Sequence, residues 1–344
     1  MILFTKDSTG RRALLFSLAF ALLHGLLSAP FSGNALNWLT LVPAAVAEAV
    51  LILHAGPLAI LLPPLLCAAV ASLCGTSLSS VLFSLCFFAC AGVLAFVMRR
   101  RMDRVGAIVM LAATCLLFLA GRTLWDAAIA AANAGASDLF GYMQSVVAEL
   151  QDSITTAYYE VYEATRVQYA EYGVQMAEIS EADIREAVAN LFSLAPSVIA
   201  LLLCLPAVLM TYGMQFVSYM RGNLRAFALE TWPFRFSPLV AGLYIALIPV
   251  VLFWRDFGSV FFIAFYNIFI VLTPLLALAE LVTLPRFYAA YRRLAGGRGI
   301  VFPILITVSV FLISPVYATV GFALLQAVNI LKAAFGSRPP RGEA

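Results

Sequence analysis

Charged side chains are scarce in this sequence, and their scarcity excludes a water-soluble protein. Only 11% of the residues are Asp, Glu, Lys or Arg, and 63% are hydrophobic, whereas soluble globular domains carry roughly 25% charged residues. The mean hydropathy of +0.97 implies more apolar surface than a water-soluble fold could cover. The composition therefore predicts an integral membrane protein.

Histidine and catalytic motifs are also rare. The chain has 2 histidines and contains neither an HExxH motif nor a GxxxxGK(S/T) phosphate loop, which argues against a metalloprotease and a self-contained ATPase. A membrane-embedded enzyme would instead require a polar cluster around His24 or His54. We predict no catalytic residue, no enzymatic activity and no cofactor. The basic loops are interpreted as orientation signals, so no nucleic-acid partner is expected.

The cysteine pattern predicts neither disulfides nor a metal site. All 6 cysteines lie within or at the ends of apolar runs, and none lies in the acidic segment 138–190, so a disulfide framework is not expected. Cys86 and Cys90 are four residues apart, a spacing that places them on one helix face. Because no His or carboxylate joins them, we interpret them as small apolar packing residues.

The apolar runs predict an all-α fold. Only helices and closed barrels satisfy every backbone polar group in hydrocarbon, and runs of about twenty apolar residues without alternation favour helices. We expect a polytopic transmembrane helical bundle of about eight or nine spans with an extracytoplasmic amphipathic helical insert. The predicted regions are an N-terminal membrane half (1–133, about five spans), an acidic helical segment (134–190) and a C-terminal membrane half with a basic tail (191–344, about three or four spans).

Proline and glycine positions predict breaks within these spans. We expect a kink or break at Pro63–Pro64, because neither residue has a backbone N–H. The last apolar run, residues 300–330, is too long for one crossing, and breaks are expected at Ser314–Pro315 and at Gly321.

The charge distribution predicts the orientation. Residues 138–190 hold ten acidic residues against Arg166 and Arg185, a local charge of −8 in a chain whose net charge is +3. Lys and Arg are retained on the cytoplasmic side of membrane proteins, and residues 99–104 hold four arginines. We therefore expect a multi-pass protein of the plasma membrane, with a cytoplasmic N-terminus and an extracytoplasmic segment 134–190.

The acidic segment has the periodicity of an amphipathic helix. Its apolar residues recur at three- and four-residue intervals, and Ser180 with Asp183 predicts a capping box opening a helix that continues into the next span. Two interpretations remain open, a solvated helical hairpin resting on the bundle and a lid over a substrate entrance. The apolar positions are Val147, Leu150, Ile154, Ala157, Tyr158, Val161 and Thr165.

Four ionisable residues within the spans are candidate ligand-binding residues, because charges at membrane depth are costly, roughly 2.5–3.5 kcal/mol each. Arg122 and Asp126 are four residues apart and are expected to pair, with an anionic or zwitterionic ligand as an alternative partner. Glu48 lies near the middle of its span, and His24 is the partner that we expect for it.

Four short motifs accompany the acidic helix: residues 54–58 (HAGPL), 98–101 (MRRR), 232–238 (WPFRFSP) and 321–325 (GFALL). Together these features resemble the YybS-like family of uncharacterised bacterial membrane proteins, and the resemblance extends over most of the chain. That family carries a domain of unknown function and is similar to the substrate-binding S components of energy-coupling-factor vitamin transporters.

The resemblance implies a membrane subunit that binds an unknown small molecule and docks on a transmembrane coupling protein driven by ATPases. S components dock through small residues on their first helix, and Ala13, Ser17 and Ala21 have that spacing here; ordinary intramolecular packing is the alternative. A second hypothesis is a membrane scaffold or assembly factor that docks partners through the extracytoplasmic helix.

Overall fold

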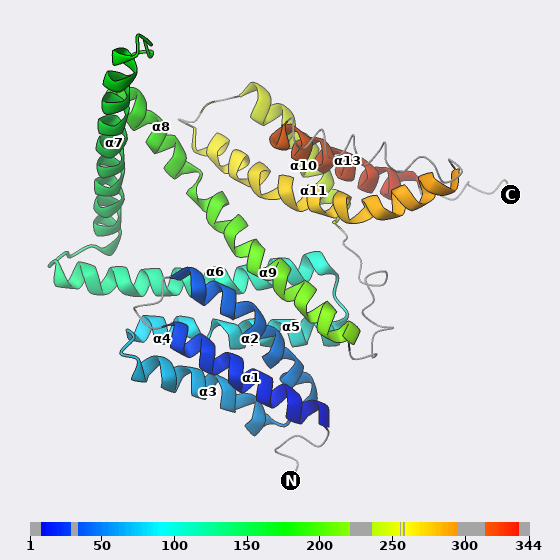
Figure 1. The fold of residues 1–344 in the computed structure, drawn as a ribbon. Coiled ribbons are helices and arrows are strands. Elements are labelled where there is room, and N and C mark those ends of the chain that lie inside the picture. The colour runs from blue at the N-terminus through cyan, green and yellow to red at the C-terminus, as the bar shows by residue number, and fades with distance from the viewer. Residues whose placement is uncertain are drawn as a thin grey trace. The chain divides into compact units, whose positions relative to one another are not determined.

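The computed structural model describes residues 8–28, 34–220, 236–254, 256, 259–294 and 314–336. Regular secondary structure in these ranges is entirely helical (Figure 1), which confirms the predicted all-α class. The helices are α1 (Ser8–Leu27), α2 (Asn34–His54), α3 (Pro57–Leu73), α4 (Leu78–Ser84), α5 (Cys86–Arg100), α6 (Arg104–Asn133), α7 (Leu139–Glu171), α8 (Glu181–Ser193), α9 (Ala195–Met220), α10 (Pro238–Phe253), α11 (Val260–Leu294) and α13 (Pro315–Gly336).

Six helical stretches among the described residues are long and apolar enough to cross a membrane. Three other apolar helices are shorter, with 10–17 residues. The longest of these three extends about 26 Å, whereas the hydrocarbon core of a bilayer is roughly 30 Å thick. This content is consistent with a multi-pass integral membrane protein. The six stretches are Gly10–Leu27, Leu78–Arg100, Arg104–Asn133, Ala195–Val217, Val260–Leu281 and Pro315–Phe335; the shorter ones are Leu39–His54, Pro57–Leu73 and Pro238–Phe253.

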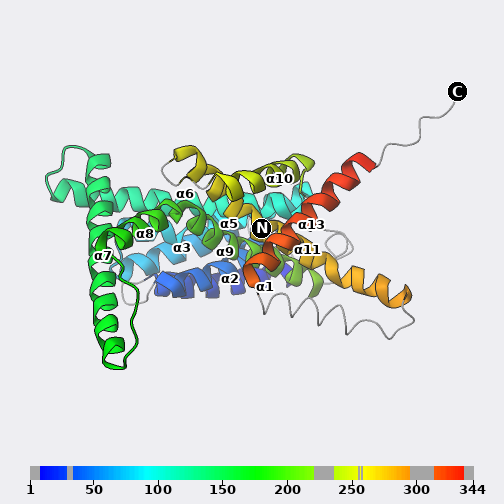
Figure 2. The same ribbon diagram turned by 90° about the horizontal axis from the view of Figure 1, so that it is seen from above.

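The chain divides into two compact units. Unit 1 comprises Met1–Ala195 and Leu202–Trp232, and unit 2 comprises Pro196–Leu201 and Pro233–Ala344. In unit 1, α1 packs against α2 and α3, α2 against α5, and α5 against α6. In unit 2, α11 and α13 lie side by side (Figure 2), and α10 packs against both.

Small residues allow the helices of unit 1 to approach closely. A Cβ atom on Gly25 of α1 would lie 2.8 Å from the backbone oxygen of Cys67 on α3, so only glycine fits there. Ala13, Ser17 and Ala21 of α1 are also buried. The small-residue stripe expected on the first helix therefore packs inside the chain.

Helix breaks follow the prolines only in part. The predicted helix from Ser180 into the next span is interrupted, because α8 ends at Ser193 and α9 begins at Ala195. Pro196 has no N–H to continue the backbone hydrogen bonds of α8, which accounts for the interruption. Pro63 and Pro64 lie inside one helix, α3. Pro315 begins α13 as expected, whereas the helix runs through Gly321.

The acidic segment forms a hairpin of α7 and α8. The chain after α7 folds back along it, since the Tyr162 hydroxyl donates to the Ala177 carbonyl oxygen. Arg166 lies 3.6 Å from Glu178, and Arg185 lies 3.5 Å from Asp152. Both arginines of the segment therefore form ion pairs between α7 and the chain that folds back along it. Four side chains of the predicted apolar pattern are exposed on α7: Val147, Leu150, Tyr158 and Val161.

Polar contacts join the helices of unit 2. The Thr273 hydroxyl of α11 donates a hydrogen bond of 3.3 Å to the Tyr244 hydroxyl of α10. Asn329 of α13 donates a hydrogen bond of 3.5 Å to Glu280 of α11. These contacts give the longest helix of the unit polar partners on both of its neighbours.

Candidate functional site

Glu48 lies at the seam between α1 and α2. Its side chain is fully buried, and its Oε2 accepts a hydrogen bond from the Ser17 hydroxyl of α1. Within the described part of the chain, Oε1 has no hydrogen-bond partner. Glu48 is thus held by one hydroxyl and has one buried oxygen free.

His24 lies farther along the same seam and is also buried. Its Nδ1 is 2.8 Å from the Thr40 hydroxyl oxygen of α2, and its ring meets Phe87 of α5 edge-on, with centroids 5.7 Å apart. The expected His24–Glu48 pair does not form; each residue bonds to a hydroxyl instead. Since the Ser17–Glu48 contact sets the register, His24 lies two turns, about 10 Å, farther along α1.

Arg122 and Asp126 form the predicted ion pair on α6, with 3.6 Å between Nε and Oδ2. Asp126 also accepts a hydrogen bond of 2.6 Å from the Ser79 hydroxyl, and the Arg122 guanidinium lies 5.3 Å from the centroid of the Phe83 ring. Both additional contacts come from α4. The pair therefore fastens α6 to α4, and no hydrogen bond or ion pair among the described residues links it to the α1–α2 seam.

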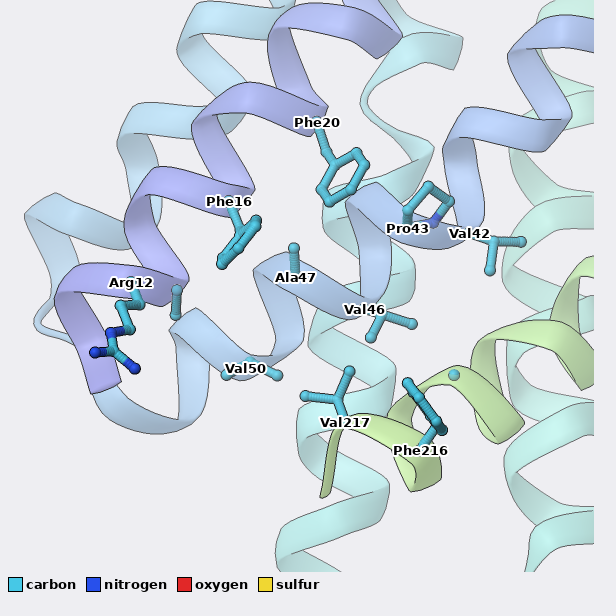
Figure 3. A pocket seen from close by; sticks show the side chains of 12 residues that line it. Arg12, Phe16, Phe20, Val42, Pro43, Val46, Ala47, Val50, Phe216 and Val217 are labelled. Atoms are coloured by element: carbon cyan, nitrogen blue, oxygen red, sulfur yellow. The ribbon is translucent and has the colours of Figure 1, made fainter. Parts of the chain in front are cut away.

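A pocket of about 900 Å³ lies between α1, α2 and α9 in unit 1 (Figure 3). Twelve described residues line it; Arg12 is the one charged residue among them, and the other eleven are apolar. None of the four predicted site residues lines it. The lining residues are Arg12, Ala13, Phe16, Phe20, Val42, Pro43, Val46, Ala47, Val50, Gly213, Phe216 and Val217.

Two walls of the pocket have a signal in the sequence. Arg12, Phe16 and Phe20 follow one another at four-residue intervals on α1, and Val42, Val46 and Val50 do so on α2. Such spacing places each set on one helix face. The contribution of α9 comes from more than 160 residues farther along the chain, and no local pattern indicates it.

The pocket can hold an elongated amphipathic molecule. Its walls offer apolar side chains along α1 and α2, and its one cation lies in the first turns of α1. A guanidinium binds carboxylates and phosphates through planar, charge-assisted hydrogen bonds. The arrangement therefore favours a ligand with an acidic head group and an apolar body.

Three cysteines form the one cluster among the described residues whose donor atoms could hold a metal ion. The Sγ atoms of Cys86, Cys90 and Cys115 all lie within 4.8 Å of one another, and all three residues are buried. The sequence spacing brings together Cys86 and Cys90 alone, because both lie on one helix face. Cys115 lies on the next helix, α6, and only the packing of α5 on α6 brings its thiol to theirs.

Comparisons with protein-family models, with curated proteins and with solved structures find no match.

Proposed function

We propose that this protein is a small-molecule-binding subunit in the plasma membrane, and that it binds an amphipathic acid in the pocket between α1, α2 and α9. The observation that carries the proposal is the lining of that pocket, eleven apolar residues and the single cation Arg12. Among the residues that the structure describes, no acidic side chain lines the pocket to neutralise Arg12. A ligand carboxylate or phosphate supplies the missing charge.

Selectivity among amphipathic ligands depends on the charge of Arg12 and on the shape of the pocket. An apolar ligand body gains little on leaving lipid for an apolar protein pocket, because lipid tails are as apolar as the side chains. A hydrogen bond to a charged group contributes about 1.5–3 kcal/mol. The head group therefore decides which amphipathic molecules bind.

The wider assembly follows from the resemblance to S components. In this proposal the chain has eight or nine spans, counting the three shorter apolar helices, with the N-terminus cytoplasmic and segment 134–190 outside. It is not an enzyme and works with a transmembrane coupling protein and its ATPases. Because Ala13, Ser17 and Ala21 are buried, docking on that coupling protein uses another surface.

Binding of oleate tests the proposal directly. The purified full-length protein is placed in nanodiscs of zwitterionic lipid and titrated with tritiated oleate, and with stearylamine as a cationic competitor. Arg12→Gln should weaken oleate binding at least about tenfold. Ala47→Phe, which fills the pocket, should reduce the number of bound oleate molecules.

Arg11→Gln is the matched control. Arg11 is the neighbouring exposed arginine on the same helix and does not line the pocket, so the variant loses the same charge without touching the ligand. Equal weakening in both arginine variants, or displacement of oleate by stearylamine, would overturn the proposal.

A membrane scaffold is the second candidate function. It is favoured by the 33-residue helix α7, whose apolar positions Leu150, Tyr158 and Val161 are exposed. In this alternative, the hairpin of α7 and α8 docks a protein partner outside the membrane. Photocrosslinking from Tyr158 in intact cells tests it, and capture of lipid alone would exclude it.

A further inference from the structure

The three-cysteine cluster has the geometry of a metal site. The Sγ atoms of Cys86 and Cys90 are 3.9 Å apart, and those of Cys90 and Cys115 are 3.7 Å apart. A metal–thiolate bond of about 2.3 Å places sulfurs around one ion about 3.8 Å apart in tetrahedral geometry and about 4.0 Å apart in trigonal geometry. Two of the three sulfur pairs are therefore already spaced as ligands of a common ion, and the third pair, Cys86 and Cys115, lies within 4.8 Å.

We propose that Cys86, Cys90 and Cys115 bind a soft monovalent cation, Cu(I). Thiolate donors select Cu(I), zinc and iron–sulfur clusters over harder cations. Structural zinc takes four ligands, and neither a histidine nor a carboxylate joins this cluster in the described part of the chain. Cu(I) accepts three sulfur ligands in a plane, which is the number that the cluster offers.

The depth of the cluster also favours a monovalent ion. Cys90 lies ten residues before Arg100 on α5, and Cys115 lies eleven residues after Arg104 on α6. At 1.5 Å per residue both are about 15 Å from those arginines, near the middle of a bilayer. Net charge is costly at that depth.

The protonation balance gives a neutral site. Cu(I) replaces the proton of one thiol and coordinates the sulfurs of the two remaining thiols, so one positive charge enters and one proton leaves to water. The same exchange leaves a divalent ion with an uncompensated charge, unless a second thiol ionises. The site is thus matched to the ion with the smallest charge.

Two other interpretations of the cluster, ordinary packing and a disulfide, explain fewer of the observations. Ordinary packing accounts for a single buried thiol, which behaves as a small apolar side chain. Cys67 is an example, because its Sγ lies 3.6 Å from the Ser84 hydroxyl and apart from the cluster. A disulfide requires sulfurs about 2.05 Å apart and an oxidant, and it leaves the third thiol unused. Convergence of all three thiols is explained by a shared ion.

The test is anaerobic titration of the purified full chain in nanodiscs with Cu(I), against bicinchoninate as a competing chelator. We expect one Cu(I) per chain, sulfur-only coordination by X-ray absorption, and release of about one proton. Cys90→Ala and Cys115→Ala should each weaken binding at least about tenfold, since even outer-shell partners of a metal cost that much.

Cys67→Ala is the matched control, because it removes a buried thiol outside the cluster. Variants that fail to fold are distinguished by thermal unfolding without metal, and a Cu(I)-dependent rise in Tm is expected for the wild type and Cys67→Ala only. Retention of full Cu(I) affinity in folded Cys115→Ala would overturn the proposal. So would binding of zinc but not Cu(I) by the wild type.

Discussion

Ser17 of α1 donates a hydrogen bond to the carboxylate of Glu48 on α2, and both side chains are buried. The carboxylate has no other partner among the described residues, because its second oxygen is unpaired. A buried polar group without a hydrogen bond costs about 1–3 kcal/mol, and more when charged. The buried carboxylate thus depends on a single hydroxyl for its hydrogen bond.

Removing that hydroxyl should destabilise the protein measurably. We expect Ser17→Ala to lower the free energy of unfolding by about 1–3 kcal/mol, because Glu48 then has no donor. The double variant Ser17→Ala, Glu48→Leu should recover most of this loss, since replacing both partners removes the unpaired group. Chemical unfolding in detergent, followed by circular dichroism, measures all three proteins.

Ser72→Ala is the control for this comparison. Its hydroxyl is exposed and donates to the Ala68 carbonyl oxygen within α3, so its loss should be nearly neutral. If Ser17→Ala proved as mild as Ser72→Ala, the hydroxyl would not be what stabilises the seam.

Local features were predictable from the sequence, whereas pairings between helices were not. The capping box predicted at Ser180 and Asp183 forms at the start of α8. Caps and ion pairs within one helix depend on residues three or four apart, which the sequence displays directly. The Arg122–Asp126 ion pair, four residues apart on α6, is of this kind.

The candidate sites depend on helix register and on distant segments. His24 and Glu48 were expected to pair because they are rare polar residues, but antiparallel packing gives each a different hydroxyl partner. The pocket needs α9, and the third thiol needs α6 packed on α5. Hydrophobic periodicity identifies the apolar face of each helix but does not indicate which faces pack against each other.

The capping box of α8 predicts a dependence on pH. Hydrogen bonds from the Ser180 hydroxyl and backbone N–H lower the pKa of the Asp183 carboxyl. A carboxyl whose folded pKa is depressed stabilises the fold above its unfolded pKa, near 3.9, and loses that contribution as the pH falls through the lower folded value. Protonation should therefore loosen the start of α8 below about pH 4.

Hydrogen exchange of the α8 amides, compared at neutral and acid pH, measures this effect. Asp183→Asn should exchange faster at neutral pH and respond less to acid. Glu186→Gln is the control, because Glu186 lies on the same helix outside the box. An unchanged acid response in Asp183→Asn would contradict the assignment.

The proposed orientation predicts which face of the membrane exposes α7. A cysteine at Glu160, which is exposed on α7, should react in intact cells with a membrane-impermeant maleimide. Arg100→Cys, on the side assigned to the cytoplasm, should react only after permeabilisation. The parent chain gives the background from its own cysteines. The reverse labelling pattern would invert the topology.

Arg101 adopts a conformation that favours glycine. It ends α5 with φ of 53° and ψ of 41°, in the left-handed region, where a residue with a Cβ is disfavoured by roughly 1–2 kcal/mol. Arg101→Gly should therefore raise the free energy of unfolding by up to about 1 kcal/mol. Arg101→Val should lower it, because a β-branched side chain fits this region poorly.

Arg100→Gly separates the backbone effect from the loss of charge. Arg100 lies within the last turn of α5 in helical conformation, where glycine costs roughly 1 kcal/mol relative to a good helix former. Both glycine variants remove one positive charge from the C-terminal end of α5, so opposite changes in Tm identify the left-handed cap as the cause. Equal changes of the same sign would assign the effect to charge, because charge is what the two variants share.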